Sequence, residues 1–171
     1  MSERKGLVTM KGNPLTLVGN EIKVGDKTPD FSVVTNDLAV VTYDDFKGKK
    51  LIISAVPSLD TGICDKETKR FNQEASKLGP ETPILTISMD LPFAQKRWCA
   101  AANVNNVKTL SDHREASFGK AYGVLIKELH LLARAIFVLD SSGVVRYIQL
   151  VKEITTEPDY NAVLDAVKKI K

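Results

Sequence analysis

The sequence predicts an α/β fold in which helices cover a mixed β-sheet. Three observations support this prediction. Residues 51–56 form a continuous apolar run, which is typical of a strand buried on both faces. A helical stripe of apolar residues begins at Cys64. Near the C-terminus, Asp140-Ser141-Ser142-Gly143 lies between two apolar runs, which indicates a hairpin. Strands and helices that alternate and then end in a hairpin and a helix are typical of this fold class.

Residues 1–20 are expected to form a hairpin extension. Val8-Thr9-Met10 and Leu15-Thr16-Leu17 flank Lys11-Gly12-Asn13-Pro14, in which Gly and Asn tolerate the positive φ of a tight turn. The pattern after this hairpin predicts three short elements, namely strands over 31–35 and 39–42 and a helical turn over 43–46. We expect residues 1–171 to form a single domain, since this length is sufficient for one hydrophobic core.

The central and C-terminal parts alternate between strands and helices. The first central helix is predicted from residues that recur at steps of three and four, namely Cys64, Thr68, Phe71, Ala75 and Leu78. The sequence Gly79-Pro80 ends this helix. The remaining predicted elements are a strand over 84–89, helices over 91–103 and 117–122, strands over 135–139 and 144–150, and an amphipathic helix over 160–167. Thr156 is the candidate cap of the last helix.

Composition disfavours several classes of protein. Hydrophobic residues make up 43% of the chain and charged residues 26%, which are ordinary values for a soluble domain. No run approaches the roughly 18 apolar residues of a membrane span. The charged N-terminus has no apolar segment after it, so we expect no secretory signal and a cytoplasmic location. A net charge of +3 spread over dispersed lysines does not favour nucleic-acid binding.

Cys64 is the candidate catalytic residue, because it lies where a buried strand ends and a helix begins. The first-turn N–H groups of a helix have no intrahelical partner and its dipole favours negative charge, so this position stabilises a thiolate, the reactive form of cysteine. Thr61 supplies a hydroxyl that can hydrogen-bond to the sulfur or to a bound oxygen. Pro57 fixes φ where the strand ends and stiffens the loop.

Cys99 and Arg134 complete the set of candidate residues. Two cysteines in a chain of this size without a signal segment indicate a catalytic pair more than a structural one. Arg134 precedes an apolar strand, where a guanidinium needs a partner if it is buried. It lies either at the surface or beside the Cys64 sulfur, where it would favour the thiolate. Only His113 and His130 could join the cysteines at a metal, and their spacing does not fit zinc.

The spacing Pro-x-x-x-Thr-x-x-Cys, at Pro57, Thr61 and Cys64, resembles the peroxidatic-cysteine motif of the peroxiredoxins. The surrounding Pro-Ser-Leu-Asp-Thr-Gly-Ile-Cys-Asp resembles the version in the bacterial thiol peroxidase subfamily. The resemblance covers nearly the whole chain and includes the Lys11-Gly12-Asn13-Pro14 turn, Val24-Gly25-Asp26-Lys27-Thr28-Pro29-Asp30-Phe31 and Arg134. It implies a thioredoxin-like fold with insertions.

The resemblance also implies a function, a thiol-dependent peroxidase of antioxidant defence. Cys64 would attack the hydroperoxide and become a sulfenic acid, while Arg134 and Thr61 stabilise the leaving oxygen. Cys99 would be the resolving cysteine, which forms an intramolecular disulfide with Cys64. Disulfide geometry needs Cα atoms within about 7 Å, so local unfolding of one or both segments is expected. Thioredoxin would be the reductant, no cofactor would be needed, alkyl and lipid hydroperoxides would be favoured, and the protein would be a homodimer.

Three alternative functions compete with this interpretation. Cys64 and Arg70 fit Cys-x₅-Arg, the phosphate loop of cysteine phosphatases, but the intervening residues contain no glycine. On a helix, Arg70 would lie about 240° around the axis from Cys64. A thiol-disulfide oxidoreductase of the thioredoxin type would need Cys-x-x-Cys, whereas Glu67 stands at that position. A redox sensor or holdase that uses the disulfide as a switch is the third alternative.

Overall fold

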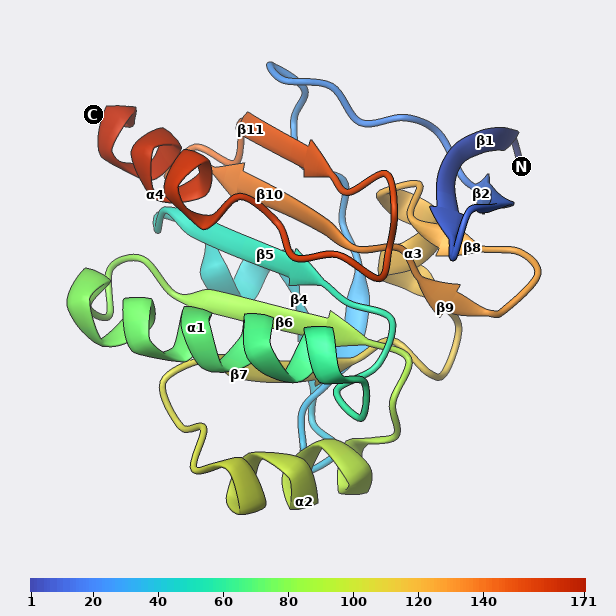
Figure 1. Cartoon of the computed structure of the whole chain (residues 1–171). Helices are drawn as coiled ribbons and strands as arrows, with labels where there is room; N and C mark the ends of the chain where they lie inside the picture. Colours follow the sequence, from blue (N-terminus) through green and yellow to red (C-terminus); the bar gives the residue numbers. More distant parts are fainter.

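A computed structural model describes residues 1–171 of the chain. The elements follow one another in this order (Figure 1): β1 (Glu3–Met10), β2 (Asn13–Val18), β3 (Ser32–Val34), β4 (Val40–Thr42), the 3₁₀ turn η1 (Tyr43–Phe46), β5 (Leu51–Ala55), α1 (Gly62–Leu78), β6 (Ile84–Ser88), α2 (Pro92–Ala102), β7 (Lys108–Ser111), α3 (Ser117–Ala121), β8 (Leu125–Ile126), β9 (Leu131–Leu132), β10 (Ala135–Leu139), β11 (Val145–Leu150) and α4 (Tyr160–Lys169). None of the helices is both long and apolar enough to span a bilayer.

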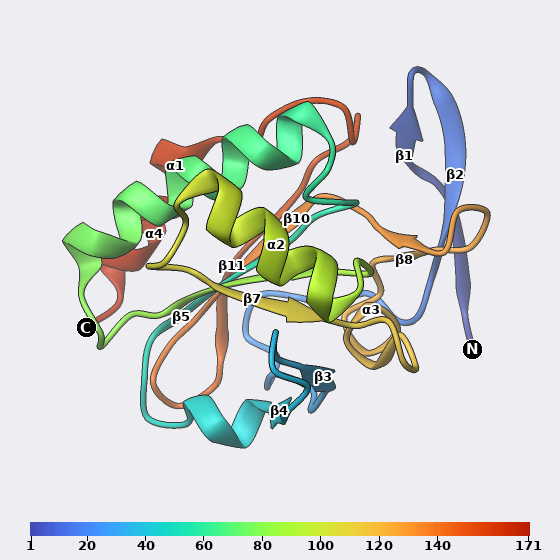
Figure 2. The same ribbon diagram turned by 90° about the horizontal axis from the view of Figure 1, so that it is seen from below.

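Seven strands form the main sheet, in the order β11-β10-β5-β6-β7-β3-β4. Strands β5, β6 and β7 are parallel, whereas β10 runs antiparallel to β5, so the sheet is mixed as predicted. Helices α1, α2 and α4 lie on one side of this sheet, and η1 and α3 lie on the other (Figure 2). The carboxyl end of β5 leads directly into the loop before α1, which brings Cys64 to this edge of the sheet.

The alternation of side chains along β5 separates two hydrophobic cores. Leu51, Ile53 and Ala55 belong to the larger core, which also contains the aromatic residues beneath α3. Ile52 packs with Phe71 of α1 and with residues of α4 in the smaller core. Ser54 points to the same side as Ile52 and is buried without being apolar. The site described below accounts for this buried hydroxyl.

The predicted N-terminal hairpin is confirmed, and it belongs to a second sheet that the sequence did not predict. This sheet has the order β1-β2-β8-β9 and is antiparallel throughout. Strands β8 and β9 have two residues each, which is too short for a period-two pattern to be detected. The hairpin tip lies against a distant segment, since Thr9 forms a β-bridge with Glu153.

The other predicted elements are confirmed with small shifts of their ends, and three details were wrong. Helix α1 begins at Gly62, so Cys64 lies in its first turn instead of at its first residue. Strand β7 was missed because its sequence, Lys-Thr-Leu-Ser, is mostly polar. Thr156 does not cap α4. The cap is Asp159, which accepts a hydrogen bond from Ala162 N at 3.0 Å, while the Thr156 hydroxyl donates to the Glu153 carbonyl.

A buried carboxylate fastens α3 to the end of β7. Asp112 accepts hydrogen bonds from the N–H groups of Phe118 at 2.9 Å and Gly119 at 2.8 Å. Gly119 also allows Leu132 to pack closely against α3, because a Cβ at this position would lie 2.7 Å from a methyl of Leu132. Burial raises the pKa of Asp112 from 3.8 to about 6, and the two N–H donors only partly oppose this shift.

The raised pKa of Asp112 predicts a pH dependence of stability. The folded state holds the Asp112 proton more tightly than the unfolded chain, so the contribution of Asp112 to the free energy of unfolding falls as pH rises from about 4 to above 6. A shift of this size corresponds to about 3 kcal/mol at most. We expect Asp112→Asn to remove this dependence. Urea unfolding of both proteins at several pH values measures the difference, and a difference that does not vary with pH would contradict the prediction.

Candidate active site

Cys64 lies in the first turn of α1 and is fully buried. Thr61 is the N-cap and has extended backbone angles (φ −94°, ψ 144°), and its carbonyl accepts the first helical hydrogen bond from Asp65 N at 2.9 Å. The sulfur therefore sits beside N–H groups that have no partner within the helix, in the positive field of the helix dipole. The predicted position of Cys64 between a buried strand and a helix start is confirmed.

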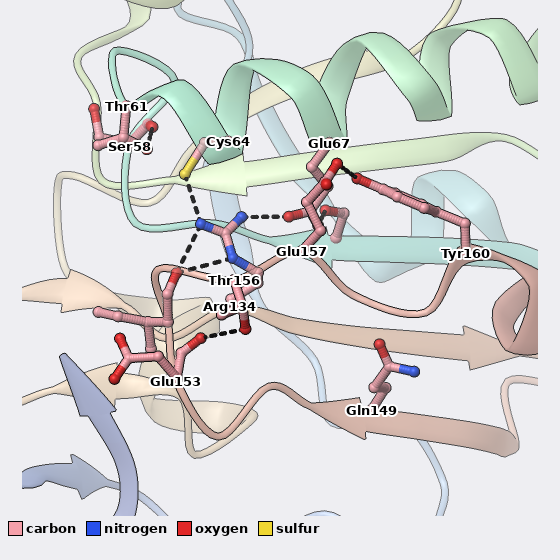
Figure 3. Close-up of polar contacts among 12 residues, drawn as sticks. Ser58, Thr61, Cys64, Glu67, Arg134, Gln149, Glu153, Thr156, Glu157 and Tyr160 are labelled. Carbon is pink, nitrogen blue, oxygen red and sulfur yellow. Dashed lines mark hydrogen bonds and ion pairs between the residues drawn. The ribbon is translucent and has the colours of Figure 1, made fainter. Parts of the chain in front are cut away.

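Arg134 lies beside Cys64, and the alternative of a surface arginine is wrong. Its side chain is 1% exposed, and Nη2 donates to the Cys64 sulfur at 3.3 Å. Nε and Nη2 also donate to the carbonyl oxygen of Ile154, at 3.0 and 2.9 Å. Nη1 donates to the carboxylate of Glu67. Figure 3 shows the guanidinium between the sulfur and this carboxylate. All three nitrogens of Arg134 are therefore used, and the planar group has a single orientation.

Glu67 is the buried partner of Arg134, and the sequence interpretation missed it. Its other carboxylate oxygen accepts a hydrogen bond from the Ser54 hydroxyl at 2.8 Å, which explains the buried serine of β5. A signal was present in the sequence. Glu67 follows Cys64 by three residues and precedes Phe71 by four, so it lies on the inward face of α1. A carboxylate on that face requires a buried cation or donor.

The charges of this pair depend on each other. Burial raises the pKa of Glu67, while Arg134 and the Ser54 hydroxyl oppose that shift. Burial alone would lower the pKa of Arg134, but Glu67 and the Cys64 sulfur outweigh burial and raise it. Arg134 is therefore a permanent cation at the sulfur. This positive charge lies in direct contact with the Cys64 sulfur.

Thr61 and Pro57 line a hollow of about 350 Å³, and Cys64 itself, which is fully buried, is not among the lining residues. The Thr61 hydroxyl donates to the Ser58 carbonyl at 2.9 Å and makes no hydrogen bond to the sulfur. Arg134 also reaches this hollow, whose other lining residues are Met10, Gly62, Ile63, Lys66, Ile154 and Thr155. A small molecule in the hollow would therefore contact the guanidinium that touches Cys64.

The structure does not bring Cys99 together with Cys64. Both thiols are free, and the Cys99 sulfur lies 3.4 Å from the Thr109 hydroxyl. Trp98, the neighbour of Cys99 on α2, packs against the small cluster that contains Cys64 and Leu59. A bond between the two sulfurs would thus require part of α1 or α2 to move.

Asp90 connects the segment before Cys64 with the segment before α2. Its carboxylate accepts hydrogen bonds from the Ser58 hydroxyl at 2.7 Å, from Leu59 N at 2.8 Å and from the Ser88 hydroxyl at 2.7 Å. Ser58 and Leu59 lie in the loop that leads to Cys64, whereas Asp90 precedes the helix that carries Cys99. Opening of one segment therefore breaks hydrogen bonds that also hold the other.

The structure does not support a phosphate loop at this cysteine. Residues 64–70 are helical and do not wrap around an anion. Arg70 points away from the sulfur, pairs with Glu74 at 3.0 Å and lies over the ring of Tyr160. No group of three or more His, Cys, Asp or Glu side chains is arranged to hold a metal ion.

The chain matches the family model described as Redoxin over residues 23–164. It is 59% identical over 162 residues to the thiol peroxidase of Halalkalibacterium halodurans, covering 94% of this chain and 96% of that protein. It is 56% identical over 163 residues to the thiol peroxidase of Bacillus subtilis, covering 95% and 97%.

Two solved structures resemble the fold. A peroxiredoxin-like protein from Aquifex aeolicus superposes with a TM-score of 0.89 at 47% identity, over 95% of each chain. A thiol peroxidase from Chromobacterium violaceum superposes with a TM-score of 0.84 over 95% of each chain, and at 22% identity it bears on the fold alone.

The contact between Arg134 and Cys64 generates a prediction about reactivity. Arg134→Met keeps the unbranched stem of the side chain as far as the position of Nε but removes its charge and its donors. We expect the second-order rate of Cys64 oxidation by hydrogen peroxide to fall about tenfold or more, because hydrogen bonds to charged groups contribute roughly 1.5–3 kcal/mol. Arg134→Lys should also be slow, since an ammonium lacks the planar fork. Stopped-flow measurement of both variants tests this.

Arg70→Met is the matched control, because it removes an arginine of α1 that pairs with Glu74 and makes no contact with the Cys64 sulfur. Its rate should stay close to that of the wild type. Since Arg134→Met leaves the Glu67 carboxylate buried without a cation, a second variant combines it with Glu67→Gln and keeps the test valid if the single variant fails to fold. Wild-type rates in both Arg134 variants would show that the guanidinium has only a structural role.

Proposed function

This chain belongs to the thiol peroxidase subfamily of the peroxiredoxins and is a thiol-dependent peroxidase, and we propose that Cys64 is the nucleophile that reduces its hydroperoxide substrate. Its α/β fold is thioredoxin-like. The observation that carries the proposal is the hydrogen bond from Arg134 to the Cys64 sulfur at a helix start, beside a hollow open to a small molecule.

In the proposed reaction, the Cys64 thiolate attacks the terminal oxygen of ROOH and the O–O bond breaks. The sulfur is oxidised to a sulfenic acid, and the leaving alkoxide takes a proton and departs as an alcohol, or as water when R is hydrogen. Arg134 supplies positive charge where the leaving oxygen becomes negative, which is how preorganised donors lower a barrier. We assign Thr61 to the same task, because it lines the hollow and carries a hydroxyl that can donate a hydrogen bond. Pro57 forms part of the wall of the hollow.

We propose that Cys99 resolves the sulfenic acid. Its thiol displaces water from Cys64–SOH, and an intramolecular Cys64–Cys99 disulfide forms. The separation of the two thiols in the resting state supports a local opening before this step, and the Asp90 hydrogen bonds are among those that must break. A thioredoxin-type dithiol then supplies two electrons and returns both cysteines to thiols.

The remaining features of the proposal come from family resemblance. We propose a single domain over residues 1–171, with the hairpin of residues 1–20 as an extension, because β2 pairs with β8 of the same chain. The hollow includes the apolar side chains of Met10, Ile63 and Ile154, which supports organic hydroperoxides as substrates together with hydrogen peroxide. A cytoplasmic homodimer that takes part in antioxidant defence fits the bacterial relatives.

Replacement of Cys64 tests the assignment of the nucleophile. Cys64→Ser changes the buried volume little, so the protein should fold, but a serine hydroxyl does not ionise near neutral pH and peroxide turnover should disappear. The assay follows NADPH oxidation in the presence of thioredoxin and thioredoxin reductase, and circular dichroism checks the fold. Turnover that persists in a folded Cys64→Ser protein would disprove the assignment.

Replacement of Cys99 tests the resolving step. Cys99→Ser should consume one equivalent of peroxide to form the sulfenic acid, or a second equivalent where it proceeds to the sulfinic acid, and should lose most thioredoxin-dependent turnover. Mass spectrometry of the oxidised wild type should find the Cys64–Cys99 bond within one chain. If the main product were a bond between two chains, the intramolecular mechanism would be wrong.

A further inference from the structure

The hollow that Arg134 reaches is lined by several parts of the chain that are distant in sequence. One wall comes from the start of α1 and the loop before it. Another part of the lining comes from Met10, at the end of β1, and from Ile154 and Thr155, in the segment between β11 and α4. The shape of the hollow therefore depends on how firmly the hairpin tip is held against the segment of residues 152–156.

Glu153 holds these two pieces together. One of its carboxylate oxygens accepts hydrogen bonds from Lys11 N at 3.0 Å and from the hydroxyl and N–H of Thr155, at 2.6 and 3.2 Å. The other oxygen accepts from Gly12 N at 3.0 Å and from the Thr9 hydroxyl at 2.8 Å. The donors of Thr155, Gly12 and Thr9 hold the pKa of Glu153 well below its usual range.

The same contacts lead to the catalytic arginine. Backbone hydrogen bonds join Thr9 to both neighbours of Glu153, from Thr9 N to the Lys152 carbonyl at 2.7 Å and from Ile154 N to the Thr9 carbonyl at 3.0 Å. The carbonyl of Ile154 in turn accepts two hydrogen bonds from Arg134. Figure 3 shows Glu153 on the far side of Arg134 from Cys64. A continuous set of hydrogen bonds thus runs from the hairpin tip to the sulfur.

We propose that Glu153 is a positioning residue for peroxide reduction, which latches the hairpin tip onto the segment of residues 152–156 and so fixes the wall of the hollow that an organic hydroperoxide contacts. This proposal rests on the proposed role of Cys64. Glu153 touches neither the sulfur nor the space of the hollow, and it acts through the lining residues Met10, Ile154 and Thr155. The organic group of a bulky hydroperoxide would contact this wall, whereas hydrogen peroxide has no organic group to make the contact. The latch therefore determines how strongly the enzyme prefers organic hydroperoxides.

The latch requires a carboxylate because of how its donors are arranged. Each oxygen of Glu153 accepts one N–H from the hairpin turn, from Lys11 and from Gly12 respectively. Glutamine has the same shape but only one acceptor oxygen, and its NH₂ group can only donate. Glu153→Gln therefore leaves at least one of these two N–H groups facing a donor. It should loosen the tip without removing buried volume.

The test compares Glu153→Gln with Glu128→Gln. Glu128 also fastens the hairpin through a carboxylate, which accepts from Thr16 N at 3.1 and 3.0 Å, but neither residue lines the hollow. Stopped-flow oxidation of Cys64 is measured with cumene hydroperoxide and with hydrogen peroxide. We expect Glu153→Gln to lower the ratio of the two rate constants by roughly fivefold, the effect of about one net hydrogen bond. Glu128→Gln should leave the ratio unchanged.

Met10→Ala tests the route of the effect. If Glu153 acts through the hairpin tip, Met10→Ala lowers the same ratio, and adding Glu153→Gln to it lowers the ratio little further. An unchanged ratio in Glu153→Gln, or an equal fall in Glu128→Gln, would overturn the proposal. If Glu153→Gln does not fold, an unchanged ratio in Met10→Ala overturns it. Failure of the proposed role of Cys64 would give a different result. In that case Cys64 of the wild type would react slowly with both cumene hydroperoxide and hydrogen peroxide.

Discussion

The buried ion pair of Arg134 and Glu67 is the interaction on which the rest of the site depends. A guanidinium that is 1% exposed is tolerated only because Glu67, the Ile154 carbonyl and the Cys64 sulfur accept its hydrogen bonds. Removing one partner of such a pair typically costs about 3–5 kcal/mol. The net contribution of the pair to the free energy of unfolding is smaller than this loss, since moving both charges out of water into the core is itself costly. Its main effect is to hold one cation at one sulfur in one orientation.

The need to satisfy this pair explains features of the chain that lie far apart in sequence. Ser54 is a polar residue in an otherwise apolar strand because its hydroxyl satisfies the second oxygen of Glu67. The segment of residues 152–156 lies where it does because its carbonyl at Ile154 faces Arg134. The N-terminal hairpin then packs on that segment through Thr9 and Glu153. Hydrogen bonds thus connect this polar site in the hydrophobic core with segments of both sheets at this edge of the molecule.

Patterns within one element were predictable from the sequence, whereas pairings between elements were not. The apolar run of β5 and the stripe from Cys64 to Leu78 predicted the strand before Cys64 and the helix that carries it, and Arg134 was identified as a cation that needs a partner if it is buried. The identity of that partner, Glu67, depends on the contact between α1 and the start of β10, which no local spacing encodes. Strand β8 is held by pairing with β2 of the hairpin, and β9 by pairing with β8. Pairing with distant segments, and not local propensity, therefore makes these two-residue segments strands. Thr156 failed as a cap because its hydroxyl turns back to its own loop, and Asp159 was closer to the helix.

In the proposed cycle, the contacts that hold Cys64 in position for the reaction with peroxide also hinder formation of the disulfide with Cys99. Arg134, the first turn of α1 and the Asp90 hydrogen bonds keep the sulfur away from Cys99, so the two half-reactions need different conformations. Oxidation can supply the change. A thiolate accepts a charge-assisted hydrogen bond from Arg134, whereas a neutral sulfenic acid accepts a weaker one. In the proposed cycle, the hydrogen bond from Arg134 to the first turn of α1 would therefore weaken only after the peroxide has oxidised the sulfur. In this way a site built around one buried cation would stay closed for oxidation and open for resolution.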